Sequence, residues 1–266
     1  MYSIQPVPNP VGLRSIERVE RTYQFANNIL AICGDTRLLW VPNLTDTTTS
    51  TSLDRNARTI TWDATIASQL TVQASGVSVS FNGTSDEADM PDTANLSFGD
   101  SVVDEPFSII AWVNQTATTG IKAIFSKFDT TGALREYQLV LDAAEKLRFR
   151  LYDESTDGYI GRLYNTALAA GGILFVAATY NGNAASSGIK LYSAAAAIDD
   201  TDDNSGTYVA MENSVTVGRL YSSGSGTPVE FFSGTGFCTV VVAKELTRDE
   251  LWALKALGNA YYDLTL

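Results

Sequence analysis

The amino-acid sequence predicts an all-β protein: a two-sheet antiparallel jelly-roll sandwich, with an N-terminal arm and helix and a short C-terminal helix. Runs of β-branched and aromatic residues follow one another from about residue 37. Turn signals separate these runs at intervals of roughly ten residues, as in sandwiches and jelly rolls. The chain has 266 residues, 45% of them hydrophobic and only 18% charged, which is enough for a sizeable core within one sandwich domain.

The N-terminal segment differs from the rest of the chain. Residues 1–10 contain three prolines and should be extended. Apolar side chains then recur at Leu13, Ile16, Val19 and Tyr23, which predicts an amphipathic helix running to about residue 30. This helix either packs on its own domain or acts as a docking arm for another copy of the chain or a further protein, and the sequence leaves both open. We therefore divide the chain into an arm and helix, residues 1–36, and a sandwich, residues 37–266.

The strands follow in order. The run "FSIIAWV" at 107–113 is apolar on both faces and predicts a central strand that is covered on both sides. Two pairs of runs predict hairpins, 136–142 with 146–153 and 173–180 with 188–194. Further strands are expected at 37–41, 76–81, 123–128, 214–220 and 236–243.

The C-terminal helix has a signal at each end. Thr247 as N-cap and Glu250 at N3 predict a capping box. Leu246 and Leu251 are placed to form a hydrophobic staple around it. Gly258 suits the C′ position and should end the helix.

Composition excludes several classes of function. The chain has no histidine, so Ser-His-Asp and Cys-His catalysis and histidine-ligated zinc are ruled out. The net charge of −12 disfavours nucleic acid as a partner. No apolar run is long enough for a membrane span, and the N-terminal residues do not resemble a secretory signal. Cys33 and Cys238 lie in apolar surroundings and are predicted to be reduced core thiols.

Seven stretches, taken in order, resemble the concanavalin A-like, laminin-G-like jelly roll of the LamG/pentraxin superfamily. They are "FNGTSDEADMP", "FSIIAWV", "IFSK", "LVLDAAEKLRFRL", "FVAATYNG", "IKLYSA" and "ELTRDEL". The chain departs from the family pattern at Asn82, Glu87 and Phe175, where the family commonly has Asp, Tyr and His. Residues 231–243 also lack the acidic pair that often precedes the last strand. The resemblance therefore implies the fold and transfers no metal site.

Glu87, Asp89 and Asp92 carry three carboxylates at close spacing. If a bulge brought them to one face of a strand, they would resemble the catalytic set of a glycosidase. The favoured interpretation is the end of a half-buried strand, with Ala88 and Met90 inward and Glu87 and Asp89 facing solvent. Pro91 should close that strand.

Two further sets of residues are candidate ligand sites. Asp200, Asp202 and Asn204 have the spacing with which an EF-hand begins, but the later positions fail, so Ca²⁺ is possible only in a different kind of loop, and a solvated acidic loop is favoured. Tyr159, Tyr164 and Tyr221 could form a carbohydrate-stacking surface, although partly buried strand-end tyrosines are favoured. No other cofactor is expected.

We expect a protein without catalytic activity. The first functional expectation is an assembly module of a virus particle, such as a phage capsid decoration or tail-associated protein. Leu13, Ile16, Val19 and Tyr23 would then contact another copy of the chain or other virion proteins. The alternative is a soluble carbohydrate-binding lectin module, which could also bind surface glycans on a virion. A glycoside hydrolase is a distant third. On the first expectation the protein would be located in the virion.

Overall fold

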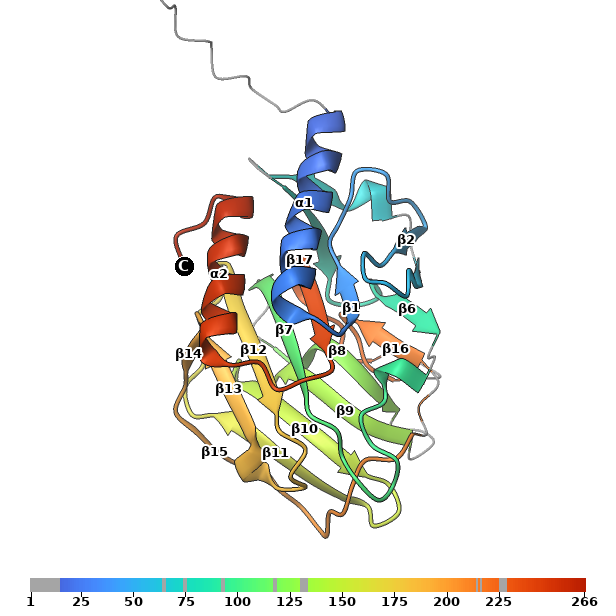
Figure 1. Cartoon of the computed structure of the whole chain (residues 1–266), viewed down its shortest axis with the longest axis vertical. Coiled ribbons are helices and arrows are strands. Elements are labelled where there is room, and N and C mark those ends of the chain that lie inside the picture. The colour runs from blue at the N-terminus through green and yellow to red at the C-terminus, as the bar shows by residue number, and fades with distance from the viewer. Residues whose placement is uncertain are drawn as a thin grey trace, which may run out of the picture.

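A computed structural model shows three layers (Figure 1): two helices, a first sheet and a second sheet. It describes residues 15–63, 66–73, 76–91, 94–116, 119–129, 134–213, 215, 217–224 and 229–266. The two antiparallel sheets pack face to face with one apolar core between them, and a second core lies between the first sheet and the helices. The predicted sandwich with a helix at each end is confirmed. The proposed division at residues 36 and 37 stays a prediction.

Within the described residues, the first sheet has eight strands and the second has nine. The first runs β14 (Ala196–Ala197), β13 (Ile189–Ser193), β12 (Leu174–Tyr180), β7 (Phe107–Gln115), β17 (Ser233–Val242), β5 (Val77–Asn82) and β4 (Leu70–Val72), with β1 (Thr36–Trp40) also pairing with β17. The second runs β15 (Asp200–Asp202), β11 (Gly158–Tyr164), β10 (Leu147–Asp153), β9 (Leu134–Leu141), β8 (Lys122–Asp129), β16 (Val217–Leu220), β6 (Ala88–Pro91), β3 (Thr59–Trp62) and β2 (Thr49–Thr51). Three 3₁₀ turns, η1 (Ile66–Ser68), η2 (Ala94–Leu96) and η3 (Ser186–Gly188), lie in the connections.

Strand β7 lies at the centre of the first sheet and is buried on both faces, as predicted. Ile109 and Val113 point into the core between the sheets, whereas Ile110 and Trp112 point to the helices. This alternation follows from the two-residue period of a strand. Both predicted hairpins are also confirmed, as β9–β10 and β12–β13.

Helix α1 (Ser15–Cys33) packs on its own domain, as the first of the two interpretations proposed. Phe25, Ile29 and Cys33 are buried against the first sheet. Phe25 also stacks on Tyr261 of the second helix, with ring centroids 4.2 Å apart. Neither described helix is long and apolar enough to cross a membrane.

Both cysteines are buried and unpaired, so the prediction of core thiols is confirmed. Burial raises the pKa of the Cys33 thiol to about 12 and raises that of Cys238 as well. Burial and a raised pKa both disfavour the thiolate, which is the reactive form of cysteine.

Helix α2 (Arg248–Tyr262) begins as predicted but ends later. Thr247 and Glu250 form the capping box, and Leu246 and Leu251 are both buried. Gly258 is not the C′ residue: the helix continues past it and ends at Asp263, which takes the left-handed conformation. Gly258 is instead needed for packing, because a Cβ there would lie 2.3 Å from Nε1 of Trp112. Sequence spacing could not show this contact with β7.

Substituting Gly258→Ala should lower the free energy of unfolding by about 1–3 kcal/mol, because the added methyl group overpacks the contact with Trp112. In an exposed helical position the same change normally stabilises by about 1 kcal/mol, so the expected sign is reversed. Urea unfolding of the parent and the variant measures the size and the sign of this change. The control is Ala256→Gly at an exposed position of α2, which should cost about 1 kcal/mol from helix propensity alone. A Gly258→Ala variant as stable as the parent would contradict the packing role.

Candidate functional site

The outer face of the second sheet carries a row of polar residues across its strands. Thr61, Asp89 and Arg219 are register neighbours on β3, β6 and β16. Ser126 of β8 and Gln138 of β9 continue the row. Gln138 and Ser126 are buried, and the Ser126 hydroxyl donates to the carbonyl of Ser222 at 2.9 Å. The chain that follows β16 therefore covers the middle of this row.

The carboxylates of the "EADMPD" stretch belong to this row. Ala88 and Met90 are buried in the core, as predicted. Glu87 was predicted to face solvent, which is wrong: only 7% of it is exposed, and it accepts hydrogen bonds from Arg219 and Ser222. Burial raises the pKa of Glu87 and of Asp89, and the Arg219 guanidinium, which contacts both carboxylates, opposes this rise. Glu87 and Asp89 thus form ion pairs with Arg219 of β16, which help to hold the two neighbouring strands of the sheet together. Asp92, the third carboxylate of the stretch, lies outside the described residues.

The three candidate tyrosines do not form one surface. Tyr221 is completely buried, with its ring stacked on Phe81 at 4.1 Å, so its proposed role in an exposed stacking surface is wrong. It lies just after β16, where the chain turns into the core. Tyr159 is half-buried beneath the guanidinium of Arg150, 4.2 Å from its ring. Tyr164 is on the opposite face of β11, partly buried against the core.

The acidic stretch around Asp200 is an edge strand, not a loop. Asp200 and Asp202 belong to β15 and both pair with Arg162 of β11. Asn204 accepts from the backbone N–H of Gly161 and donates to Ser186. Within the described part of the chain, no group of three or more acidic or cysteine side chains is arranged to hold a metal ion. An arginine between the two carboxylates does not fit a Ca²⁺ site.

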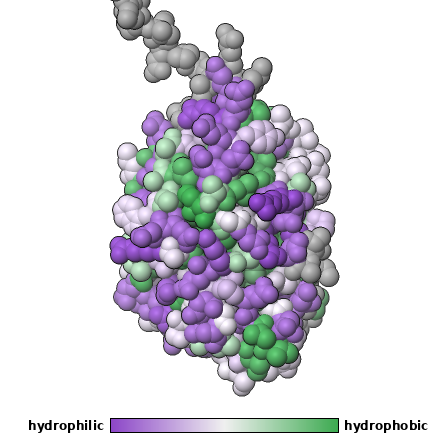
Figure 2. Space-filling view, viewed as in Figure 1, coloured by the Kyte–Doolittle hydropathy of each residue, from purple (hydrophilic) through white to green (hydrophobic). Residues whose placement is uncertain are grey.

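Of the proposed assembly residues, only two have described side chains. Tyr23 is 51% exposed on α1, and Val19 is half-buried. Leu13 lies outside the described residues, and the side chain of Ile16 is not described. Figure 2 shows polar side chains along α1 and apolar ones gathered between its C-terminal half and α2.

Three adjoining cavities form a polar groove at the edge of the sandwich, beyond the C-terminal end of α1. We call it the edge groove. Its two larger cavities, of about 530 and 500 Å³, share Arg37, and a third of about 330 Å³ shares Asn56 and Asn95 with the first. The described polar residues that line it come from distant parts of the sequence: Asp35, Thr36, Arg37, Arg55, Asn56, Arg58, Thr59, Asn95, Ser97, Asp100, Asp104, Glu105 and Asn213.

One end of the edge groove is cationic. Arg37 is held by Asp35, with Nε and Nη2 donating to the two carboxylate oxygens at 3.0 and 2.9 Å. Arg58 donates through Nε to the carbonyl of Arg37 at 3.1 Å. Arg55 is exposed on the same wall. Asn56 and Asn95 lie between these arginines, with Nδ2 of Asn95 3.4 Å from Oδ1 of Asn56.

The middle of the groove is supported by a hydrogen-bonded chain that reaches the interior. The Ser97 hydroxyl donates to Asn213 at 2.8 Å and accepts from the Lys127 ammonium at 2.6 Å. Lys127 is fully buried and pairs with the equally buried Glu136 at 2.9 Å. Burial raises the pKa of Glu136, and Lys127 opposes the rise. Val215 donates its backbone N–H to the same carboxylate.

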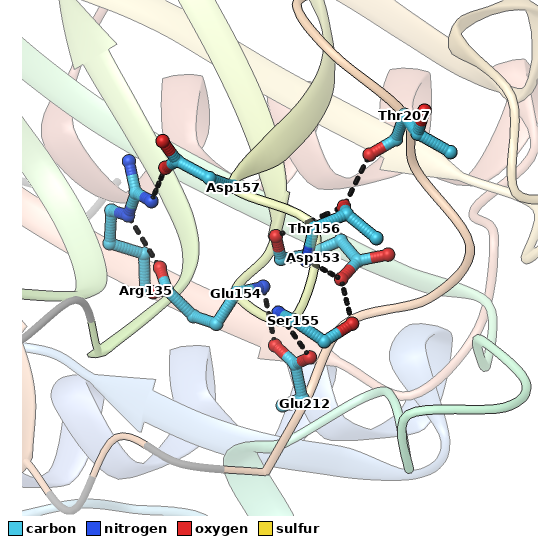
Figure 3. A network of polar contacts seen from close by, with 8 residues as sticks. All are labelled: Arg135, Asp153, Glu154, Ser155, Thr156, Asp157, Thr207 and Glu212. Atoms are coloured by element: carbon cyan, nitrogen blue, oxygen red, sulfur yellow. Dashed lines mark hydrogen bonds and ion pairs between the residues drawn. The ribbon is translucent and has the colours of Figure 1, made fainter.

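The other wall of the groove is fixed by the loop that joins β15 to β16. Asp104 accepts from the hydroxyls of Tyr180 and Tyr208, both at 2.6 Å, and from the backbone of Met211. In the network of Figure 3, Glu212 accepts from two backbone N–H groups in the turn between β10 and β11, and Arg135 pairs with two carboxylates of that turn. These contacts anchor Tyr208, Met211 and Glu212 of the loop to the neighbouring segments.

Sequence reasoning missed the edge groove. Its residues come from positions as far apart as Arg37 and Asn213, and none belongs to a local motif. The polar stretch between β6 and β7 is the only hint, because it is long for a connection inside a sandwich.

Comparison with known protein families places the chain among the lectin-like jelly-roll sandwiches. The laminin G family model of the concanavalin A-like lectin/glucanases superfamily matches residues 82–251. The match spans more than half of the chain, and the chain belongs to this superfamily. The resemblance predicted from the sequence is confirmed. A comparison with curated protein sequences gave no significant match.

Solved structures show the same fold at low identity. The botulinum neurotoxin serotype G binding domain aligns with a TM-score of 0.57 and 10% identity, over 85% of this chain and 52% of that chain. The serotype D ligand-binding domain, solved with N-acetylneuraminic acid, gives 0.54 and 12%, over 86% and 52%. A structure from work on cell entry of botulinum neurotoxin type C and its interaction with two ganglioside molecules gives 0.56 and 13%, over 86% and 53%. This chain spans about half the length of these neighbours.

The Lys127–Glu136 pair gives a stability prediction. Lys127→Met should lower the free energy of unfolding by roughly 3–5 kcal/mol near neutral pH, because it leaves a buried carboxylate without its counter-charge. Without the ammonium, the pKa of Glu136 rises further in the folded state only. The loss should therefore shrink as the pH falls and Glu136 takes up a proton.

Urea unfolding at about pH 5 and about pH 8 measures this dependence. The matched control is the double variant Lys127→Met/Glu136→Leu, which removes both charges and should be more stable than the single variant. A single variant whose stability loss is the same at both pH values would contradict the role of the pair.

Proposed function

We propose that this protein is a carbohydrate-binding module and that the edge groove holds the glycan. The observation that carries the proposal is the composition of the groove: amide, guanidinium, hydroxyl and carboxylate side chains converge on adjoining cavities. Sugar hydroxyls both donate and accept hydrogen bonds. The side-chain amides of Asn56, Asn95 and Asn213 each carry both a donor and an acceptor.

The rigidity of the groove favours binding. Asn213 is held through Ser97 by the buried Lys127–Glu136 pair, and Asp104 holds Tyr208 and Met211 in the same loop. A site whose polar groups are already in place loses little conformational freedom when a ligand binds. The lectin-like superfamily and neighbours described with N-acetylneuraminic acid and gangliosides are consistent with a glycan ligand. Arg55 at the cationic end suits a sugar that bears a carboxylate.

Glycan-array screening followed by calorimetry with the best glycan tests the proposal. Asn95→Ala and Asn213→Ala should each weaken binding about threefold to tenfold, because each removes a hydrogen bond to the sugar. Asn27→Ala is the control, since Asn27 is exposed on α1 and does not line the groove. No binding to any glycan, or equal binding by all three variants, would count against the edge groove.

A second candidate function is assembly on a virus particle, as a phage decoration or tail-associated protein. The observation that favours it is the exposure of two large aromatic side chains on the helical layer, Tyr23 at 51% and Trp252 at 49%. Such side chains are enriched where proteins meet. Removing residues 1–30 is not a clean test, because it deletes Phe25 and Ile29 from the core.

The double variant Tyr23→Ser/Trp252→Ser should abolish self-association if this surface joins copies of the chain, because it removes the aromatic anchors and leaves the core intact. Sedimentation velocity of the full chain measures the oligomeric state. Val72→Thr serves as the control, since Val72 is equally exposed but lies on β4. An oligomer that survives in the double variant would show that the helical layer is not the contact.

A further inference from the structure

A second cavity, separate from the edge groove, lies between α1 and the chain that leads from β1 into β2. It measures about 290 Å³, and none of its described lining residues also lines the edge groove. Its lining includes Tyr23, Asn43, Thr45, Thr47, Thr49 and Thr51, and we call it the threonine pocket. Neither of the functions above uses it as a ligand site.

The sequence builds its threonine wall by two devices. In β2, the two-residue period turns Thr49 and Thr51 outward, while Ser50 points inward and accepts from Nε1 of Trp62 at 2.9 Å. Before β2, a closed turn fixes the chain: Asn43 donates its backbone N–H to the Asp46 carboxylate at 2.9 Å, and Asp46 donates its own to the Asn43 carbonyl at 3.0 Å. Both devices leave the threonines in defined positions.

The hydroxyl groups of this wall are available to a ligand. Thr45, Thr47, Thr49 and Thr51 are all exposed. Within the described residues, none of their hydroxyls has a hydrogen-bond partner. Each can therefore donate one hydrogen bond and accept others.

The opposite wall supplies an aromatic ring. Tyr23 projects from α1 and is 51% exposed, and in the described chain its ring contacts no other aromatic ring. An exposed ring face opposite a row of hydroxyls matches a pyranose, which has an apolar face of C–H groups and a polar edge of hydroxyls. The cavity volume is at the lower limit for small-molecule sites, which suits one sugar ring and not a chain.

The charge of the pocket narrows the ligand class. Among the described residues that line the pocket, Asp46 is the one ionisable group besides Tyr23, and it is buried and bonded to Asn43. No described cation lines the pocket to pair with an acidic sugar, in contrast to Arg37 and Arg55 in the edge groove. We infer that the threonine pocket is a second saccharide site, which takes a single neutral pyranose stacked on Tyr23 and hydrogen-bonded by the threonines.

Nuclear magnetic resonance of the full chain, labelled with ¹³C on its tyrosine rings, tests this inference. The probes are glucose, galactose, mannose and N-acetylglucosamine, each titrated to about 100 mM because single-ring sites bind weakly. The Tyr23 signal is assigned with the variant Tyr23→Phe. We expect at least one sugar to move this signal saturably, and Thr49→Val/Thr51→Val to weaken that sugar about tenfold.

The matched control is Thr61→Val/Thr71→Val. These threonines are exposed on β3 and β4, and they are not among the described lining residues of the threonine pocket or the edge groove. This control should bind as the parent does, and so should Asn95→Ala in the edge groove. If no sugar moves the Tyr23 signal, or if both threonine pairs weaken binding equally, the inference is overturned. The edge-groove proposal stands or falls separately, because it is tested by calorimetry with the best glycan of the array, whereas this inference is tested by the Tyr23 signal with single sugars.

Discussion

The first sheet has to be covered on both faces, and the other layers of the protein follow from that requirement. Its central strand β7 is apolar on both sides, so a two-sheet sandwich alone would leave Ile110 and Trp112 in water. Helices α1 and α2 cover that outer face. The cover is close enough for the backbone of Gly258 to lie against the Trp112 ring. Because burial of these large side chains stabilises the fold most, the helices are part of the domain's core.

The covering helices also explain where the cavities lie. The edge groove opens beyond the end of α1, where its Leu30 meets the start of β1 and the turn after η2. The threonine pocket opens beside the same helix, where the chain runs from β1 to β2. Polar networks then fix the walls at these margins. The buried Lys127–Glu136 pair holds Ser97, and Asp104 holds the loop between β15 and β16.

Local sequence patterns were enough to predict the strands and helices. The positions of the candidate site residues depend on contacts between segments that are far apart in the sequence. The burial of β7, both hairpins and the Thr247 capping box depend on residues close together in sequence, and all were predicted correctly. Gly258 was misassigned because its role comes from Trp112, which is far away in the chain. Glu87 was misassigned for the same reason, since its partner Arg219 lies on a strand that joins β6 only in the folded sheet.

Tyr221 and the edge groove show the same limit in different ways. A tyrosine after a strand can point to solvent or into the core, and only the turn of the chain at this point, where Tyr221 has a positive φ of 65°, sends it inward. The groove unites Arg37, Asn95 and Asn213 from three separate segments. No pattern within one segment could have brought these residues together.

Helix α1 has a further consequence for binding, because it borders both cavities. Tyr23 lines the threonine pocket, and Leu30 lines the edge groove. These residues are seven positions apart, so they lie on the same side of the helix and about 10 Å apart along its axis. The two cavities are thus fixed relative to each other by a rigid element that is itself anchored in the core. If both cavities bind sugars as proposed, two weak sites held at a fixed spacing would favour a surface that displays many sugars, because the second contact forms at a high effective concentration once the first is made. The element that completes the core would then also set the geometry in which the protein meets a glycan surface.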